Sequence, residues 1–210
     1  MAKSSKSIPP TVVKRLTRYL AHVRRLAAGE TEWVSSHEIA EALGLTSSTV
    51  RQDLSHIDFS GISKRGYETS GLQRVIESVL GADRTWHMIV VGAGNLGRAL
   101  TLHEDFQRHG FHIVGIFDND DGKIGKKVGR FVVQGMRRTA SFVKANDVEI
   151  GIIAVPAVAA QGVAAHLAAA GVRGLLNMSQ THIAVPEDVR VVDARIVASL
   201  QELSHGLSFR

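Results

Sequence analysis

A glycine-rich turn between an apolar segment and a helical pattern is the feature that most constrains the fold of this chain. The apolar segment His87–Val91 enters the sequence Gly92-Ala93-Gly94-Asn95-Leu96-Gly97, and apolar residues at helical spacing follow it. In such a turn the first glycine permits a tight bend, the second lets backbone approach a pyrophosphate, and the third lets the helix pack on its strand. The order of strand, turn and helix therefore predicts a dinucleotide-binding site, with a merely structural turn as the alternative.

An acidic residue follows at the spacing that such a site needs. Asp118 ends the next apolar segment, Ile113–Phe117, about twenty residues beyond the last glycine. A carboxylate there can accept hydrogen bonds from ribose hydroxyls, and it should repel a 2′-phosphate. We therefore expect the cofactor to be NAD(H) rather than NADP(H).

Apolar segments alternate with helical or polar ones up to residue 192. They predict strands at 131–133, 150–155, 174–177 and 189–192, and an alanine-rich helix over 157–170. This alternation predicts an α/β fold, a Rossmann-like doubly wound parallel sheet, over residues 84–192. Because ligands bind beyond the carboxyl ends of such strands, Val155-Pro156 and Asn177 are further cofactor candidates. For the first, a proline that only ends its strand is an equal alternative.

The segment before this unit is long enough to be a second domain, and it is basic. The chain has 210 residues and a net charge of +5. Residues 1–29 contain no acid, and their basic residues are Lys3, Lys6, Lys14, Arg15, Arg18, Arg24 and Arg25. This charge suits an acidic partner such as nucleic acid.

Composition narrows the compartment and the chemistry. The chain has no cysteine, which excludes disulfides and thiolate metal sites and is compatible with a reducing compartment. No apolar run has membrane-spanning length, and the N-terminus lacks the apolar part of a secretory signal. These features predict a cytoplasmic protein without a membrane partner. We expect no metal either, because His103, His109 and His112 lack the spacing of a metal site.

Residues 1–80 are predicted to form a winged helix-turn-helix domain. A basic amphipathic helix follows Pro9-Pro10 and ends at Gly29. Ser35 and Glu38 stand at capping-box spacing and begin a second, short helix. A third helix is predicted over Ser48–Ile57, and two short helices joined by a glycine-containing turn are typical of a helix-turn-helix.

The third helix of this domain is expected to enter the major groove of double-stranded DNA. Arginine can contact guanine and glutamine can contact adenine, while serine and threonine suit phosphate oxygens. A predicted hairpin wing over 61–69 follows, and its basic turn suits the DNA backbone or minor groove. The expected DNA contacts are Ser48, Thr49, Arg51, Gln52, Ser55, Lys64 and Arg65. The alternative is a solvated polar face.

Residues 193–210 end the chain with an amphipathic helical segment. Ile196, Leu200, Leu203 and Leu207 share one stripe of this segment. The stripe can cover its own sheet or lie against a second subunit, and the sequence leaves both open. Since helix-turn-helix proteins usually bind DNA as dimers, the second alternative has a functional reason.

Taken in order, the motifs of both regions resemble the Rex family of redox-sensing transcriptional repressors over nearly the whole chain. The segments that carry the resemblance are Ile8-Pro9, Val34–Ser36, Val50–Ser55, Lys64–Tyr67, Val91–Gly97, Phe117-Asp118, Lys123–Gly125, Val155–Ala157, Ala160-Gln161 and Gly174–Asn177. The resemblance implies a homodimer whose subunits exchange their C-terminal helices and which is not an enzyme. It implies repression, through a palindromic operator, of genes for NADH-oxidising and fermentative or respiratory pathways. The resemblance further implies that repression is relieved when NADH displaces NAD+.

The resemblance also assigns residues to the two sites. By motif, Arg51, Gln52, Lys64 and Arg65 would touch the operator. The glycine loop, Asp118, Lys123, Val155-Pro156 and Asn177 would line the cofactor site.

The chain departs from the family pattern at the sensing end. His103 stands where many relatives have a tyrosine near the nicotinamide, and Arg195 replaces an aspartate of the exchanged helix. Met178 and Gln180 stand in place of a usual aromatic residue and a usual proline. The alternative to a repressor is an NAD-dependent oxidoreductase with an N-terminal interaction module, for which His103 or His182 would be the proton donor.

Overall fold

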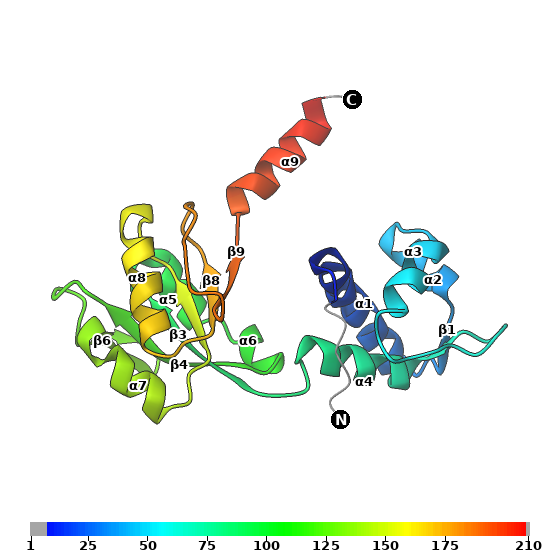
Figure 1. Ribbon diagram of the computed structural model, residues 1–210, viewed down its shortest axis with the longest axis horizontal. Coiled ribbons are helices and arrows are strands. Elements are labelled where there is room, and N and C mark those ends of the chain that lie inside the picture. The colour runs from blue at the N-terminus through cyan, green and yellow to red at the C-terminus, as the bar shows by residue number, and fades with distance from the viewer. Residues whose placement is uncertain (1–7, 209–210) are drawn as a thin grey trace. The chain divides into compact units, whose positions relative to one another are not determined.

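The computed structural model describes residues 8–208 as two compact units, which divide between Arg84 and Thr85 (Figure 1). Lys3 and Lys6 of the basic segment lie outside the described residues. The first unit is mainly helical, and the second contains a seven-stranded sheet.

The helices of the first unit pack around one apolar core. Its elements are α1 (Pro10–Ala28), β1 (Trp33–Val34), α2 (Ser36–Leu43), α3 (Ser47–Leu54), β2 (Tyr67–Glu68) and α4 (Thr69–Leu80). The core joins Leu16 and Val23 of α1 to Ile39 of α2, Leu54 of α3 and Ile76 of α4. The apolar residues that recur at helical spacing therefore form the buried stripe of each helix.

Local sequence signals set the ends of the two short helices. The predicted capping box is confirmed, because the Ser35 hydroxyl accepts from the Glu38 N–H and the Glu38 carboxylate accepts from the Ser35 N–H. Gly44 ends α2 in the left-handed conformation, with φ 66°. Helix α3 ends at Leu54 and not at Ile57 as predicted, because the N–H groups of the last residues bond three residues back in a tighter turn.

The wing differs from the predicted hairpin. Strand β2 pairs antiparallel with β1, which precedes the helix-turn-helix, and Ile62 and Gly66 form only an isolated bridge. The chain reversal predicted over 61–69 is present as the antiparallel bridge of Ile62 and Gly66, whereas the pairing of β2 with β1 was not predicted, because pairing between distant segments has no local signal. The basic turn Lys64-Arg65 lies inside the bridged loop.

The second unit has the predicted doubly wound sheet. Its strands are β3 (Trp86–Val91), β4 (Phe111–Asp118), β5 (Lys127–Val128), β6 (Phe131–Gly135), β7 (Ile150–Ile153), β8 (Gly174–Asn177) and β9 (Arg190–Asp193). They lie in the order β5-β6-β4-β3-β7-β8-β9, and every pair except β5–β6 is parallel. Without β5, this is the strand order of dinucleotide-binding sheets, which reverses at the first strand, here β3.

Helices cover the sheet, with a core on each of its faces. They are α5 (Asn95–Thr101), α6 (Asp105–Arg108), the 3-10 turn Met136–Arg138, α7 (Thr139–Ala145) and α8 (Ala157–Ala169). Ile89 of β3 packs in one core with α7 and α8, and its neighbour Val90 packs in the other. Alternation along β3 therefore feeds both cores. Strand β7 ends at Ile153, two residues earlier than predicted, and Ala154–Pro156 lead into α8.

Helix α9 (Ile196–Ser208) carries the predicted apolar stripe and leaves it exposed. Ile196, Leu200, Leu203 and Leu207 are 57–62% exposed, and the helix has no buried residue. The alternative that this stripe covers its own sheet was therefore wrong.

Candidate nucleotide and nucleic-acid sites

Two glycines of the 92–97 loop are required by the fold itself. Gly92 has φ +105°, a conformation that side chains rarely adopt, and a Cβ there would collide with the carbonyl oxygen of Ala154. A Cβ at Gly97 would collide with the backbone of Gly92. The loop is therefore closely packed between the end of β3, the end of β7 and the start of α5, and leaves no room for a side chain at Gly92 or Gly97.

Gly94 differs from both neighbours. A Cβ at Gly94 would meet no atom within 4 Å, and its φ of −77° is open to any residue. Gly94 lines a cavity with Gly92 and Asp118. No packing therefore requires glycine at this position, whereas the close approach of a ligand would require it.

Asp118 lies at the end of β4 and is hydrogen-bonded to the glycine loop. It is almost fully buried, and its Oδ2 accepts from the Ala93 N–H at 2.7 Å and from Lys123 Nζ at 3.1 Å. Its Oδ1 accepts from the Asp120 N–H at 2.9 Å. The residue therefore joins the glycine loop to the turn after β4, besides being placed where a ribose binds in such folds.

These partners keep Asp118 ionised. Burial raises the pKa of its carboxyl, but the N–H groups of Asp120 and Ala93 and the Lys123 ammonium outweigh burial and hold that pKa below its ordinary value. The hydrogen bond to Asp118 in turn raises the pKa of Lys123. A fixed negative charge at this strand end disfavours a ligand with a 2′-phosphate.

A cavity of about 460 Å³ gathers many of the predicted cofactor residues. Of these residues, its lining includes Gly92, Gly94, Asp118, Lys123, Val155 and Pro156. Ala93, Asn95, Leu96 and Gly97 belong to the adjoining loop and helix start without lining the cavity, and Asn177 lies apart on β8. The cavity sits beyond the carboxyl ends of β3, β4 and β7, at the switch point of the sheet.

The side chain of Asn177 is fully occupied within the protein. Its amide nitrogen donates to the Thr181 carbonyl and to Asp193 Oδ1, both at 2.8 Å. Its amide oxygen accepts from the N–H and the hydroxyl of Ser179. The amide is therefore a buried hub between β8, β9 and the following loop, with no hydrogen-bonding capacity left for a ligand.

His103 and Arg195 lie outside the glycine-loop cavity. His103 is exposed, packs edge-on against Phe106 and lines a separate hollow with Arg108 and Arg130. Arg195 donates to Asp193 at 3.0 Å. Within one chain, neither side chain reaches the residues around Gly94.

The outward face of α3 carries the predicted DNA contacts. Ser48, Arg51, Gln52 and Ser55 are exposed. Thr49 is half-buried, and its N–H and hydroxyl bond the Thr46 hydroxyl that caps the helix. The structure therefore gives Thr49 a structural task that the sequence pattern did not reveal.

The two wing cations have different surroundings. The Arg65 guanidinium lies 3.9 Å from the centre of the Trp33 ring and 3.7 Å from Glu32. Lys64 is exposed and has φ +64°, the left-handed conformation. A lysine in this conformation is strained, and strained residues cluster at functional sites.

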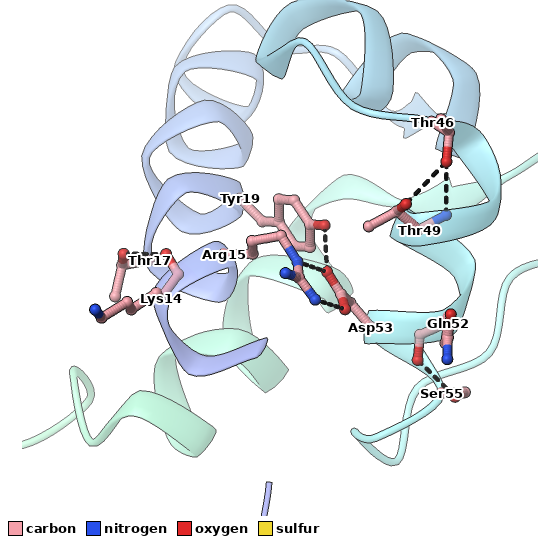
Figure 2. Close-up of polar contacts among 9 residues, drawn as sticks. All are labelled: Lys14, Arg15, Thr17, Tyr19, Thr46, Thr49, Gln52, Asp53 and Ser55. Atoms are coloured by element: carbon pink, nitrogen blue, oxygen red, sulfur yellow. Dashed lines mark hydrogen bonds and ion pairs between the residues drawn. The ribbon is translucent and has the colours of Figure 1, made fainter. Parts of the chain in front are cut away.

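Sequence reasoning missed the buried centre of the first unit. Asp53 of α3 is 2% exposed and binds Arg15 and Tyr19 of α1, as Figure 2 shows. The available signal was the helical spacing of Asp53 with the apolar face of Val50 and Leu54, since a carboxylate on that face needs a partner. Arg15 is therefore not part of a solvated basic face.

No helix among residues 8–208 is long and apolar enough to cross a membrane. No cluster of three or more histidine or acidic residues in that range could hold a metal ion.

Comparison with known proteins covers both units. Residues 7–55 match the family model "Putative DNA-binding protein N-terminus", and residues 83–181 match "CoA binding domain". A redox-sensing transcriptional repressor Rex of Carboxydothermus hydrogenoformans is 42% identical over 200 residues, which cover 95% of this chain and 96% of that protein.

Solved structures agree over the same length. The structure of RSP, a Rex-family repressor, in complex with β-NAD+ and operator DNA has a TM-score of 0.91 and 32% identity. It covers 96% of this chain and 93% of that one. The complex of RSP with β-NADH has a TM-score of 0.86 and 32% identity, and covers 96% and 95%.

The fold defines a protein that joins a winged helix-turn-helix unit to a dinucleotide-fold unit. The chain belongs to the Rex family of redox-sensing transcriptional repressors.

Proposed function

We propose that this protein is a repressor that binds palindromic operator DNA and releases it in response to NADH. The observation that supports this most directly is the presence of two separate candidate sites on one chain. One is the exposed face of Arg51, Gln52 and Ser55 on α3 with the wing cations Lys64 and Arg65. The other is the cavity at the glycine loop.

The residues of the cavity fit NAD(H). The bare Gly94 leaves room for the pyrophosphate, and ionised Asp118 favours a free 2′-hydroxyl on the ribose. Lys123, Val155 and Pro156 line the remaining wall. When bound, the cofactor would supply two redox states that differ in charge and shape at the nicotinamide.

The proposed assembly is a homodimer in which α9 packs against a second copy of the chain. The exposed stripe of α9 supports this proposal, because four exposed apolar side chains on one helix are costly in water. A dimer would also present two recognition helices to a palindromic operator. Residues 1–80, 84–192 and 193–210 would thus be the DNA-binding, cofactor-binding and dimer-forming parts.

We propose that the chain is not an oxidoreductase. Both proton-donor candidates, His103 and His182, are exposed and lie outside the glycine-loop cavity. Stoichiometric binding of NADH without turnover of small carbonyl substrates is the expected behaviour. The protein would act in the cytoplasm, where its operator DNA is accessible.

A crossed experiment with two variants tests the two sites separately. Arg51→Ala removes the main base-contacting cation and should weaken operator binding by about 1–3 kcal/mol per recognition helix, with unchanged NADH affinity. Asp118→Ala should weaken NADH binding and leave operator binding by the cofactor-free protein unchanged. Fluorescence anisotropy of a labelled duplex and calorimetric titration of NADH measure the two affinities.

Matched controls carry the same change of charge elsewhere. Arg173→Ala and Asp188→Ala remove exposed charges of the second unit and should alter neither affinity. If Arg51→Ala lowered both affinities together, it would indicate misfolding and not a DNA contact. If coenzyme A bound more tightly than NADH, the proposed cofactor would be wrong.

A further inference from the structure

The recognition helix α3 has a buried charge on the side opposite its proposed DNA face. Asp53 lies between the exposed Gln52 and the buried Leu54, and only 2% of it is accessible. A carboxylate at this position is expensive to bury unless each of its lone pairs is well satisfied. The chain therefore has a charge at a position where an apolar side chain could be buried with a smaller desolvation penalty.

Three donors of α1 converge on this carboxylate. Arg15 donates from Nε to Oδ2 at 2.5 Å and from Nη2 to Oδ1 at 2.6 Å, and the Tyr19 hydroxyl donates to Oδ2 at 2.6 Å. Figure 2 shows both side chains pointing from α1 to Asp53. Arg15 and Tyr19 are four residues apart, so they lie on one face of α1.

The electrostatics favour the ionised carboxylate. Burial raises the pKa of the Asp53 carboxyl, but the hydrogen bonds from Arg15 and Tyr19 outweigh burial and hold that pKa below its ordinary value. Burial and the bond to Asp53 raise the pKa of the Tyr19 hydroxyl. The three groups therefore remain one charged, hydrogen-bonded unit near neutral pH.

This geometry adds a directional restraint to the apolar packing of α3. Val50 and Leu54 hold α3 against the core, but hydrophobic contact is not directional. A bidentate arginine–carboxylate pair has a defined plane and direction. Helix α1 also contacts the other helix of the pair, since Arg18 donates to the Leu43 carbonyl of α2 at 2.7 Å.

We propose that Asp53, held by Arg15 and Tyr19, sets the rotation of α3 about its axis and is a positioning residue for operator recognition. This inference rests on the proposed function, because the face that it orients is the proposed DNA face. Asp53 would touch no base or phosphate. It would determine which groove atoms Arg51 and Gln52 can reach.

The proposal separates two kinds of DNA binding. Contact with base edges depends on the rotation of α3, whereas non-specific binding depends on the number of cations near the phosphates. Loss of the Asp53 charge should therefore lower affinity for the operator and not for random duplex. A merely destabilised protein would lose both.

The test compares Asp53→Asn and Tyr19→Phe with Asp58→Asn, which makes the same change of charge at an exposed residue of the same unit. Operator and random-duplex affinities are measured at one salt concentration. Asp53→Asn should lower the operator affinity about tenfold or more and change the random-duplex affinity less than about twofold. Tyr19→Phe should show a smaller loss of the same kind, and Asp58→Asn should resemble the wild type.

Hydrogen exchange supplies a readout that needs no DNA. In Asp53→Asn, amides of α3 should exchange faster while those of α2 and of the second unit keep their protection. Unchanged α3 protection, or an unchanged ratio of operator to random-duplex affinity, would overturn the inference. Should Asp53→Asn not fold, Tyr19→Phe decides by the same two measurements.

The two proposals fail in different ways. A wild-type protein with equal affinity for operator and random duplex would contradict the proposed function. Hydrogen exchange in α3 would then still show whether the network holds the helix in place.

Discussion

Gly94 and Gly97 belong to the same loop but have different neighbours, which leads to opposite predictions for one substitution. Gly94→Ala should change the melting temperature little, because its Cβ would meet no protein atom. The same Cβ would occupy space that the pyrophosphate needs beside the cavity, so NADH binding should weaken about tenfold or more. Gly97→Ala should lower the melting temperature, at a cost of about 1–3 kcal/mol, because its Cβ would collide with the backbone of Gly92. Calorimetry measures both quantities.

The pair serves as its own control. Both variants add one methyl group to the same loop, so a general effect of alanine would appear in both. An unchanged NADH affinity in Gly94→Ala would mean that no ligand approaches the backbone at this position.

Lys64 gives a prediction in which stability and binding move apart. Its left-handed backbone costs about 1 kcal/mol for a side chain other than glycine or asparagine. Lys64→Asn should therefore leave the free energy of unfolding unchanged or higher, yet weaken DNA binding and reduce its salt dependence by about one unit. Chemical denaturation and binding at several salt concentrations measure the two effects. Equal affinity with an equal salt slope would show that Lys64 contacts no phosphate.

At the scale of elements, the exposed stripe of α9 predicts the oligomeric state. Leu203→Glu places a charge in the middle of the stripe and should shift the protein from dimer to monomer. Each of the two copies would lose the burial of one leucine side chain, which stabilises the dimer by about 1.5–3 kcal/mol. Gln201→Glu adds the same charge beside the stripe and should remain dimeric. Sedimentation velocity distinguishes the species. A wild-type monomer, or a dimer unaffected by Leu203→Glu, would contradict the proposed packing of α9.

Most elements could be predicted from the sequence because their signals are local. The capping box at Ser35 and the apolar–glycine–helix order at 87–100 each depend on residues that are near in sequence. The parallel sheet followed from alternation alone, and the parallel pairing of its strands is confirmed for every pair except β5–β6. By contrast, β1, β2 and β5 are strands of two residues without a pattern of their own, so their pairing could not be predicted.

The candidate sites were predictable to a similar extent. The glycine loop and Asp118 stand at diagnostic spacing, and the structure brings both to one cavity. The hydrogen bonds that occupy the whole Asn177 amide, and those that surround Asp53, could not be predicted, because their partners lie on other elements. Sequence spacing places a residue on a face, but only the fold shows which atoms meet it there.

In the whole molecule, operator release in response to NADH requires coupling between the two units. A ligand shifts an equilibrium only by its difference in affinity for two states. NADH and NAD+ must therefore bind unequally to the DNA-binding and DNA-free forms of the dimer. Couplings of this kind are commonly about 5–150-fold in affinity.

The most direct measurement titrates NADH and NAD+ separately into the protein bound to a labelled palindromic operator at fixed salt. We predict that NADH lowers the operator affinity at least about fivefold relative to NAD+, and that Asp118→Ala shifts this response to higher NADH concentration. An operator affinity that is the same with NADH, NAD+ and no nucleotide would contradict the account.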